Sequence, residues 1–355
     1  MLDCTRRSLA RLSMTALRFW LATHLLWTAL LAASTGETAL TRFEFSQPYM
    51  GTQFRVVVYA PDAAAASRAS TAAFKRIAAV DNTMSDYNPG SELMSLCRRA
   101  GGRPVRVSED LFQVLAKSQE LAERTDGAFD ITVGPVVRLW RRARRQRELP
   151  APDELARARQ LVGYRKLRLN ARARTAKLLK KGMLLDLGGI AKGYAADQAL
   201  AVLKAQGISS ALVVAGGEVA VSAPPPGRPG WRVGIAPLES PENPPTRFLL
   251  LHDVAVSTSG DAEQYVEIEG KRYSHIVDPR TGLGLVGRSS VTVVAPNGTT
   301  SDAMATAISV LGPERGLELV RATPGTAALI TQASDDGPRT FELNLRPYVC
   351  PRELE

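Results

Sequence analysis

The chain has 355 residues, of which 45% are hydrophobic, so it is long enough for one large domain or two smaller ones with a real core. Its formal net charge is +10, and positive charge is concentrated in "RLWRRARRQRELP" (138–150), without an aromatic platform, zinc spacing or helix-turn-helix spacing. We therefore expect a solvated helix face there and no nucleic-acid partner.

The N-terminal segment predicts export. "TRRSLARL" (5–12) precedes an apolar run over 19–33, and twin arginines before a modest hydrophobic stretch are typical of a twin-arginine signal peptide. We assign residues 1–36 to this signal, with cleavage somewhere between Ala32 and Ala39, and expect a periplasmic mature protein. The alternative is a single anchoring helix, although the run is shorter than the ~20 residues of a membrane span.

The first half of the mature chain is predicted to be mainly helical. Alternation and β-branched residues predict a strand over 52–60, and "AFD" (128–130) is expected to enter a short strand. Ser108 followed by acids is an N-terminal capping signature, and Pro152 suits a helix start. The expected helices are 62–84, 108–127, 152–164 and 191–207, and the expected hairpin is "KLRLN" (166–170) with "AKLLKKGMLLDLGG" (176–189).

The second half is predicted to be rich in strands. It also contains two expected helices, at 300–312 and near 313–323, and a last strand near 326–332. We see no internal repeat and no linker. Early helices and late strands favour an α+β fold over a regularly alternating parallel sheet, so we expect one globular unit over 42–345.

The stretch "DLGGIAKGYAADQA" (186–199) is expected to approach a ligand. Closely spaced glycines allow a close backbone approach, which we assign to Gly188 and Gly189. The two well-known phosphate-loop patterns, GxGxxG and GxxxxGK[ST], cannot be read here. Lys192 is expected to face either a carboxylate or a phosphate, and Asp186 is expected to secure the turn into the following helix.

Metal-binding side chains are restricted to oxygen donors. With three histidines in the chain, a multi-histidine zinc or iron site is improbable, and Cys97 and Cys350 could equally form a disulfide or remain apart. Asp302 and Thr306 lie four residues apart, so a helix places both oxygens on one face. They are hard ligands that suit Mg²⁺, although an aspartate at a helix start can simply compensate the helix dipole.

Two further segments offer chemistry. His275 precedes the polar turn at Asp278, so it can act as a general base, bind a phosphate or flavin edge, or satisfy a backbone group. In the "AFD" stretch, Asp130 can accept a hydrogen bond from a ligand and Phe129 can pack on a planar ring. An ordinary helix-to-strand turn is the alternative interpretation of that stretch.

Taken together and in this order, eight short motifs resemble the ApbE family, the FAD:protein FMN transferases, over residues 48–332. They are "MGT" (50–52), "MSDYNPGSEL" (84–93), "GAFDITVGP" (127–135), "DLGGIAKGYAAD" (186–197), "VVAGGEVA" (213–220), "VSTSGD" (256–261), "YSHIVDPRTG" (273–282) and "SDAMATA" (301–307). The chain departs from the family pattern at Ala262, where an aromatic residue is usual, and in having a twin-arginine signal instead of a lipoprotein cysteine.

The resemblance implies a T-fold-like α+β core and a Mg²⁺-dependent reaction. Members of the family split the pyrophosphate of FAD and place the FMN half on a threonine hydroxyl of a client flavoprotein, with release of AMP. That activity serves maturation of periplasmic or membrane redox proteins, so contact with a membrane is expected only through the client or an uncleaved signal. The alternatives are Mg²⁺-dependent hydrolysis of FAD to FMN and AMP, and a non-catalytic FAD carrier.

The resemblance also assigns residues. It implies metal binding by Asp302, Thr306 and a backbone carbonyl near Leu200, and catalysis by His275. Because Asp278 lies near His275 in the sequence, we expect it to assist that histidine as a second catalytic residue. The positions that match FAD contacts are Met50, Tyr87, Ala128, Phe129, Asp130, Asp197 and Ile276, with Gly188, Gly189 and Lys192 as further members of the nucleotide wall. The sequence does not identify the client or the oligomeric state.

Overall fold

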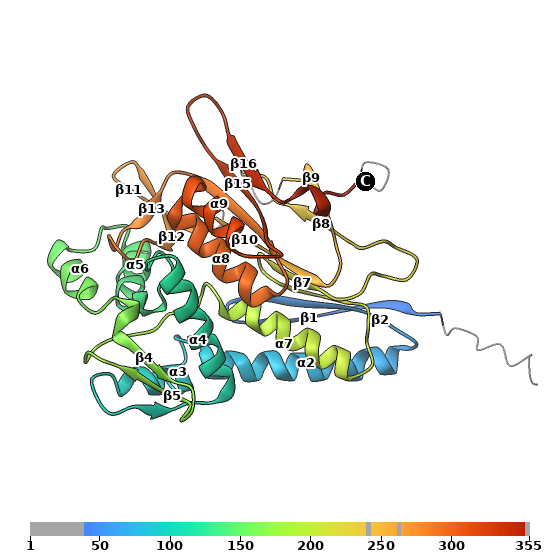
Figure 1. Cartoon of the computed structure of the whole chain (residues 1–355), viewed down its shortest axis with the longest axis horizontal. Helices are drawn as coiled ribbons and strands as arrows, with labels where there is room; N and C mark the ends of the chain where they lie inside the picture. The colour runs from blue at the N-terminus through green and yellow to red at the C-terminus, as the bar shows by residue number, and fades with distance from the viewer. Residues whose placement is uncertain (1–38, 239–242, 261–263, 352–355) are drawn as a thin grey trace, which may run out of the picture. The chain divides into compact units, whose positions relative to one another are not determined.

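The computed structural model describes residues 39–238, 243–260 and 264–351. The expected signal peptide and Ala262 lie outside these residues. The described residues from Leu40 onward form a compact unit, built on an eight-stranded antiparallel sheet (Figure 1). In spatial order its strands are β1 (Thr41–Tyr49), β2 (Thr52–Ala60), β6 (Ala211–Ala215), β7 (Glu218–Val221), β10 (Val254–Gly260), β14 (Ser289–Ala295), β15 (Ala327–Gln332) and β16 (Arg339–Leu343).

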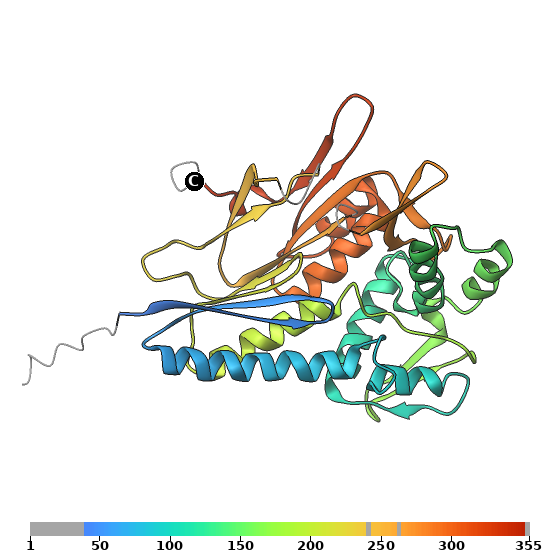
Figure 2. The same ribbon diagram turned by 180° about the vertical axis from the view of Figure 1, so that it is seen from behind.

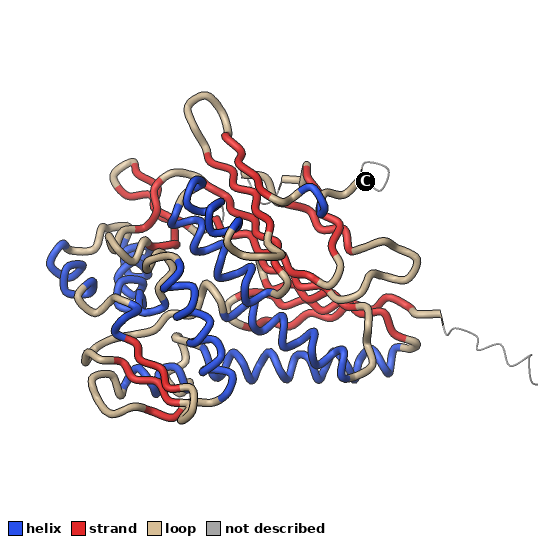
Figure 3. Tube along the Cα trace, in the orientation of Figure 1, coloured by secondary structure: helices blue, strands red, loops and turns tan. Residues whose placement is uncertain are grey.

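Helices cover one face of this sheet, and a two-stranded sheet covers part of the other. Alternate residues of β2 divide between the two sides: Val56 and Val58 belong to the core shared with the helices, whereas Val57 packs with Trp231 and Leu251. From Val56 to its end, strand β2 is therefore apolar on both faces. The covering elements are α2 (Ala63–Met84), α7 (Ala191–Ala205), α8 (Gly298–Leu311) and α9 (Pro313–Arg321) on one side, and β8 (Trp231–Ile235) with β9 (Arg247–Leu251) on the other (Figures 1 and 3).

Smaller elements complete the unit. From behind, Figure 2 shows the long hairpin of β1 and β2 running beside α2. The remaining helices are α3 (Glu92–Arg98), α4 (Glu109–Arg124), α5 (Gly134–Gln146) and α6 (Pro152–Arg159), with 3-10 turns at Ile131–Val133, Tyr164–Lys166 and Arg346–Tyr348. The remaining strands are β3 (Val105–Arg106), β4 (Leu167–Asn170) and β5 (Thr175–Leu178) in one sheet, and β11 (Tyr265–Ile268), β12 (Lys271–Val277) and β13 (Gly284–Val286) in another.

The predicted fold class is confirmed, and most of the expected helices lie where the sequence places them. The Ser108 hydroxyl accepts from the Leu111 N–H and caps α4, as its capping signature predicts. The helix expected over 152–164 is shorter and ends at Arg159. The second strand of the expected 176–189 hairpin is also shorter, because β5 ends at Leu178 and the chain then leaves the small sheet.

The strand expected after "AFD" is wrong, because the chain forms a 3-10 turn that continues into α5. Asp130 Oδ1 accepts from the N–H of Thr132 at 2.8 Å and from its hydroxyl at 2.7 Å, which starts the turn. Pro135 follows in the first turn of α5, where its missing N–H costs nothing. The hydrogen bonds to Asp130 and the proline at the helix start both favour helical over extended backbone.

Cys97 and Cys350 are buried free thiols, so the structure contains no disulfide between them. Within the described part of the chain, no helix combines the length and the apolar character that crossing a membrane requires.

Candidate active site

Two glycines bring α7 and α8 into backbone contact. A Cβ atom added to Gly193 would lie 2.0 Å from the carbonyl oxygen of Gly298, a distance that no side chain tolerates. The same close approach lets the Gly193 N–H donate to Asp302 Oδ2 at 3.0 Å. Asp302 is 1% exposed, so the crossing buries a carboxylate against the start of α7.

The second predicted metal ligand lies against the same motif. A Cβ atom on Gly189 would lie 2.8 Å from Thr306 Oγ1, so the backbone of Gly189 passes directly beside that hydroxyl. The structure thus brings Asp302 and Thr306 of α8 to the glycine-rich entrance of α7. Hydroxyl and carboxylate oxygens there form a donor set that suits a hard cation.

Leu200 does not belong to this cluster, which corrects the expected backbone ligand. It lies seven residues beyond Gly193, about 10 Å further along α7 at 1.5 Å per residue. Its carbonyl is inside the helix, where carbonyls accept from the N–H four residues ahead. The backbone near Gly189 and Gly193, rather than Leu200, lies beside the two ligands.

A buried ion pair lies beside Asp302. Lys192 Nζ donates to Glu218 Oε1 at 2.9 Å, so the lysine faces a carboxylate, one of its two expected partners. Although burial lowers the pKa of Lys192, Asp302 and Glu218 together raise it above its ordinary value. Burial raises the pKa of Glu218 to about 7, against the opposing effect of Lys192, and it also raises the pKa of Asp302. Two buried carboxylates therefore share one lysine.

The cluster has capacity for another cation. Glu218 Oε2 is buried and lacks a hydrogen-bond partner among the described residues. A group of three or more His, Cys, Asp or Glu side chains placed to hold a metal is absent from the described part of the chain. A cation here would therefore complete its shell with the Thr306 hydroxyl, backbone or ligand oxygens.

Asp197 has a structural role that differs from the expected contact with the flavin nucleotide. Its Oδ1 accepts from the Gly298 N–H at 2.6 Å, and its Oδ2 accepts from the N–H and the hydroxyl of Thr299 at 2.8 and 2.6 Å. These donors lie at the start of α8. Both oxygens of Asp197 thus tie α7 to the helix that carries Asp302.

Tyr87 is joined to the glycine-rich motif through Arg141 of α5. Tyr87 is 74% exposed, and the Arg141 guanidinium lies 4.2 Å from the centroid of its ring. Arg141 also pairs with Asp86 and donates to Asp186 Oδ2 at 2.7 Å, while Asp186 Oδ1 accepts from the Gly188 N–H at 2.8 Å. The expected role of Asp186 in securing the turn is confirmed. Gly188 is exposed beside this chain of contacts, where a ligand could approach its backbone.

His275 lies near the end of β12, before the turn to β13. Its Nδ1 is 3.1 Å from the carbonyl oxygen of Gln264, and its backbone N–H donates to the same carbonyl. Asp278 Oδ1 accepts from the N–H and Nε of Arg280, both at 2.9 Å, so the Asp278 carboxylate holds the turn. This geometry makes Asp278 an organiser of the segment that carries His275.

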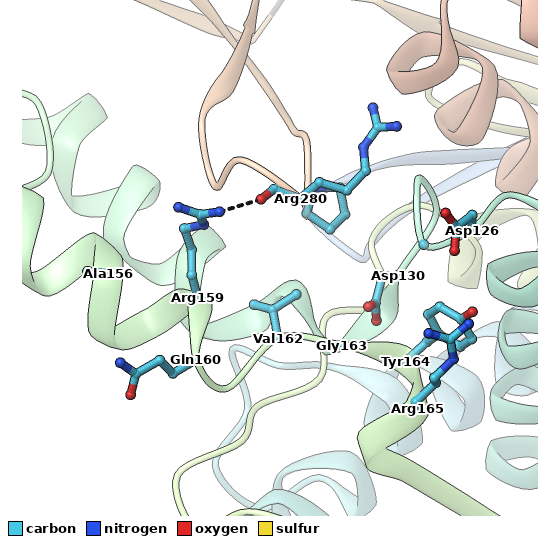
Figure 4. A pocket seen from close by; sticks show the side chains of 12 residues that line it. Asp126, Asp130, Ala156, Arg159, Gln160, Val162, Gly163, Tyr164, Arg165 and Arg280 are labelled. Atoms are coloured by element: carbon cyan, nitrogen blue, oxygen red, sulfur yellow. Dashed lines mark hydrogen bonds between the residues drawn. The ribbon is translucent and has the colours of Figure 1, made fainter.

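Two helices clamp this turn from outside. Trp140 Nε1 of α5 donates to the Gly282 carbonyl at 2.8 Å. Arg159 Nη2 of α6 donates to the Arg280 carbonyl at 2.7 Å, as Figure 4 shows. The Trp140 ring also packs against Tyr273 with centroids 5.2 Å apart. The position of the β12–β13 turn is therefore determined by side chains far from it in sequence.

The "AFD" stretch divides between the core and a cavity. Phe129 is 4% exposed within the main core, so ring stacking by Phe129 on a bound ligand is not supported. Ala128 packs with Ile276, which brings two predicted FAD-contact positions together. Asp130 lines a cavity of about 530 Å³ that also includes Arg280, and burial raises the pKa of Asp130 (Figure 4).

Met50 is part of the β1–β2 hairpin turn. Met50 and Gly51 have φ angles of 50° and 73°, the left-handed pair that suits a tight hairpin. The Met50 N–H lies 3.3 Å from Asp81 Oδ2 of α2, and its side chain packs partly against the main core. A contact between Met50 and FAD stays a prediction.

Three important residues escaped prediction: Gly193, Glu218 and Arg141. Gly193 and Glu218 fall inside quoted motifs, and the glycine in a helical pattern was a signal for a close helix contact. Arg141 was part of a basic run that gave no reason to separate one arginine from its neighbours. Its partners Asp86 and Asp186 are distant in sequence.

Known proteins resemble this chain over most of its length. The ApbE family model matches residues 50–330. The FAD:protein FMN transferase of Treponema pallidum (strain Nichols) is 34% identical over 309 residues, covering 83% of this chain and 85% of its own length. That of Escherichia coli (strain K12) is 32% identical over 308 residues, covering 85% and 87%.

Solved structures show the same fold. The flavin transferase ApbE from Vibrio cholerae superposes with a TM-score of 0.78 at 29% identity, covering 87% of this chain and 99% of that one. The flavinyl transferase ApbE from Pseudomonas stutzeri, in its apo form, gives a TM-score of 0.76 at 29% identity, covering 89% and 97%.

Proposed function

Because the chain belongs to the ApbE family, we infer that it is an FAD:protein FMN transferase, an enzyme that moves the FMN half of FAD onto a client protein. Relatives named for this activity align over more than four fifths of the chain. The observation that carries the inference is the α7–α8 crossing, where Asp302 and Thr306 meet the glycine-rich motif beside Lys192 and Glu218.

We propose that Asp302 and Thr306 hold Mg²⁺. The fit rests on their hard oxygen donors and on the buried, unpartnered Oε2 of Glu218, which marks local excess negative charge. When bound, Mg²⁺ neutralises charge on the pyrophosphate of FAD during phosphoryl transfer. Gly193 keeps Asp302 oriented by donating its N–H to Oδ2.

His275 is proposed to take the proton from the acceptor threonine. The Gln264 carbonyl can only accept, so a hydrogen bond from Nδ1–H leaves Nε2 as the basic nitrogen. The threonine oxygen forms a bond to the FMN phosphorus as the bond to the AMP phosphate oxygen breaks. AMP leaves with that oxygen, and the hydroxyl proton passes to His275.

Export by the twin-arginine route and a periplasmic location remain part of this proposal. Their support is the sequence pattern "TRRSLARL" followed by an apolar run. In that compartment the client would be a periplasmic or membrane redox protein with an acceptor threonine.

The test is to incubate the chain with FAD, Mg²⁺ and a client domain that carries an acceptor threonine, and to follow flavin fluorescence in a denaturing gel. We expect a fluorescent client, and His275→Ala should abolish transfer while FAD binding is retained. Free FMN without a labelled client would instead indicate hydrolysis, and neither product would indicate an FAD carrier. Loss of FAD binding in His275→Ala would show that this histidine is structural.

A further inference from the structure

Helix α5 carries five arginines on one side. Successive residues of a helix turn by about 100°, so Arg138, Arg141, Arg142, Arg144 and Arg145 fall within one arc, which we name the arginine face. The opposite side of α5 contains Val136, Trp140 and Ala143, which are buried. The arginine face is therefore the outer side of a helix that is well packed underneath.

Its charge is only partly compensated. Arg141 pairs with Asp86 and Asp186, and Arg142 pairs with Glu154. Arg138, Arg144 and Arg145 form no ion pair with any carboxylate that the structure describes, and Arg138 and Arg145 are exposed. Like charges three or four residues apart destabilise a helix, so this face is suited to an anionic ligand that relieves the repulsion.

The arginine face is continuous with the candidate active site. A hollow of about 360 Å³ is lined by Tyr87, Arg141, Arg144 and Arg145. Arg144 Nη1 contacts the Gln264 side chain at 3.3 Å, and the Gln264 carbonyl accepts from the backbone N–H of His275. One edge of the face thus meets Tyr87, and another meets Gln264, which is hydrogen-bonded to His275.

We propose that the arginine face docks an acidic segment of the client protein close to its acceptor threonine. This proposal rests on the proposed function, because it concerns the client of that same reaction. Guanidinium groups bind carboxylates in paired hydrogen bonds, and opposite charge accelerates encounter between proteins. An acidic client segment bound along Arg138 and Arg145 would hold the client beside Tyr87 and His275.

The test compares two double variants that lose the same charge. Arg138→Gln/Arg145→Gln removes the exposed part of the arginine face, and Arg68→Gln/Arg172→Gln removes two exposed arginines of α2 and the β4–β5 turn. The probe is a fluorescein-labelled peptide of about ten glutamates, with a glutamine peptide of equal length as its control. Fluorescence anisotropy measures binding to the FAD- and Mg²⁺-loaded full chain.

We expect the wild type to bind the glutamate peptide at about 50 mM salt and to lose most of the affinity at about 500 mM. The arginine-face variant should raise the Kd by about tenfold, which corresponds to weakening of two charged contacts, whereas the control should change it less than about twofold. Affinity for FAD should be equal in all three proteins.

Three results would overturn the proposal. Equal weakening in both double variants would attribute binding to net charge, and a lower FAD affinity in Arg138→Gln/Arg145→Gln would assign the face to the nucleotide. Absence of peptide binding by the wild type would also reject it. The anisotropy is read without any transfer, so failure of FMN transfer in the gel assay remains a separate result.

With a client domain that is labelled in the gel assay, the same variants give a kinetic test. Loss of the docking contact should raise the KM for the client several-fold in Arg138→Gln/Arg145→Gln, leaving the KM for FAD and the kcat unchanged. A lower kcat at an unchanged client KM would contradict docking by this face.

Discussion

Gly193 and Gly298 allow two helix backbones to touch, and this contact positions the proposed metal ligands. The Gly193 N–H reaches Asp302, and Gly189 leaves room for the Thr306 hydroxyl. Asp197 then caps α8 and holds the two helices in register. At the residue scale, the glycine-rich motif therefore acts through close contact within the protein as well as toward any ligand.

The variant Gly193→Ala, which adds one methyl group, tests this role of Gly193. In Gly193→Ala the new Cβ would overlap the Gly298 carbonyl, so α7 and α8 must separate. We expect the free energy of unfolding to fall by about 2–3 kcal/mol and transfer to be lost. Urea denaturation measures the first effect and the gel assay measures the second.

Gly188→Ala in the same motif is the matched control for stability. Its added Cβ would meet only the Asp186 side chain, at 3.0 Å. We expect the free energy of unfolding to change by less than about 1 kcal/mol. Equal stability losses in the two variants would show that the α7–α8 contact at Gly193 does not require a glycine more than the turn at Gly188 does.

The Cys97 thiol gives a second test at this scale. Burial raises the pKa of Cys97 to about 11, so the thiolate is scarce at neutral pH. We expect native protein at about pH 8 to react with iodoacetamide far more slowly than unfolded protein does. Mass spectrometry of the Cys97 peptide measures the rate, and equally fast labelling in both states would contradict the buried environment.

Among the elements, α5 organises the site from outside. Its Arg141 lies over the Tyr87 ring and donates to Asp186. Its Trp140 donates to a carbonyl of the turn after His275. The sequence predicted a solvated basic helix face but gave no sign of these contacts, since every partner lies more than forty residues away. The Ser108 cap was predictable because its hydroxyl and the Leu111 N–H that it accepts from are only three residues apart.

Trp140→Phe should disturb catalysis more than stability. The variant keeps a ring against Tyr273 but loses the hydrogen bond to the Gly282 carbonyl, so the His275 segment is less firmly placed. We expect the kcat for transfer to fall by about tenfold with the KM for FAD nearly unchanged.

Trp231→Phe is its matched control, because Trp231 Nε1 also donates to a carbonyl, that of Ala223 at 3.0 Å. Trp231 lies in β8, within the core on the other face of the large sheet. Its replacement should cost similar stability, about 1 kcal/mol, with kcat retained. A similar loss of kcat in both variants would show that the effect is not specific to the β12–β13 turn.

Asp110 of α4 connects this helix to α2 and α7, and it makes the stability of the protein depend on pH. It pairs with Arg76 of α2, and it accepts from the Tyr194 hydroxyl of α7 at 2.6 Å. The Arg76 guanidinium holds the pKa of Asp110 below its usual value, so this stabilisation is present above the unfolded pKa, about 4, and is lost as pH falls through the lower folded pKa.

Asp110→Asn should therefore lower the free energy of unfolding by about 1–2 kcal/mol at neutral pH, and the difference from wild type should shrink once the pH falls below about 4. Urea denaturation of both proteins across that range measures it. A constant difference at all pH values would mean that the ionised carboxylate contributes nothing.

For the whole described unit, the sheet acts as a scaffold between two cores. Helices α2, α7 and α8 occupy one face, and the β8–β9 pair lies against the other. Strand and helix patterns were sufficient to predict α+β architecture. The sequence could not predict that Asp197 caps a helix one hundred residues later, because that contact exists only once α7 and α8 cross.

The most direct test of the account is the coupling of AMP release to labelling of the client. With FAD, Mg²⁺ and a client domain, the wild type should release one AMP for each client that becomes fluorescent. Asp302→Asn should reduce both by about 100-fold or more because a metal ligand is lost, whereas the exposed Asp336→Asn should change neither. AMP released without client labelling, or full labelling by Asp302→Asn, would contradict the account.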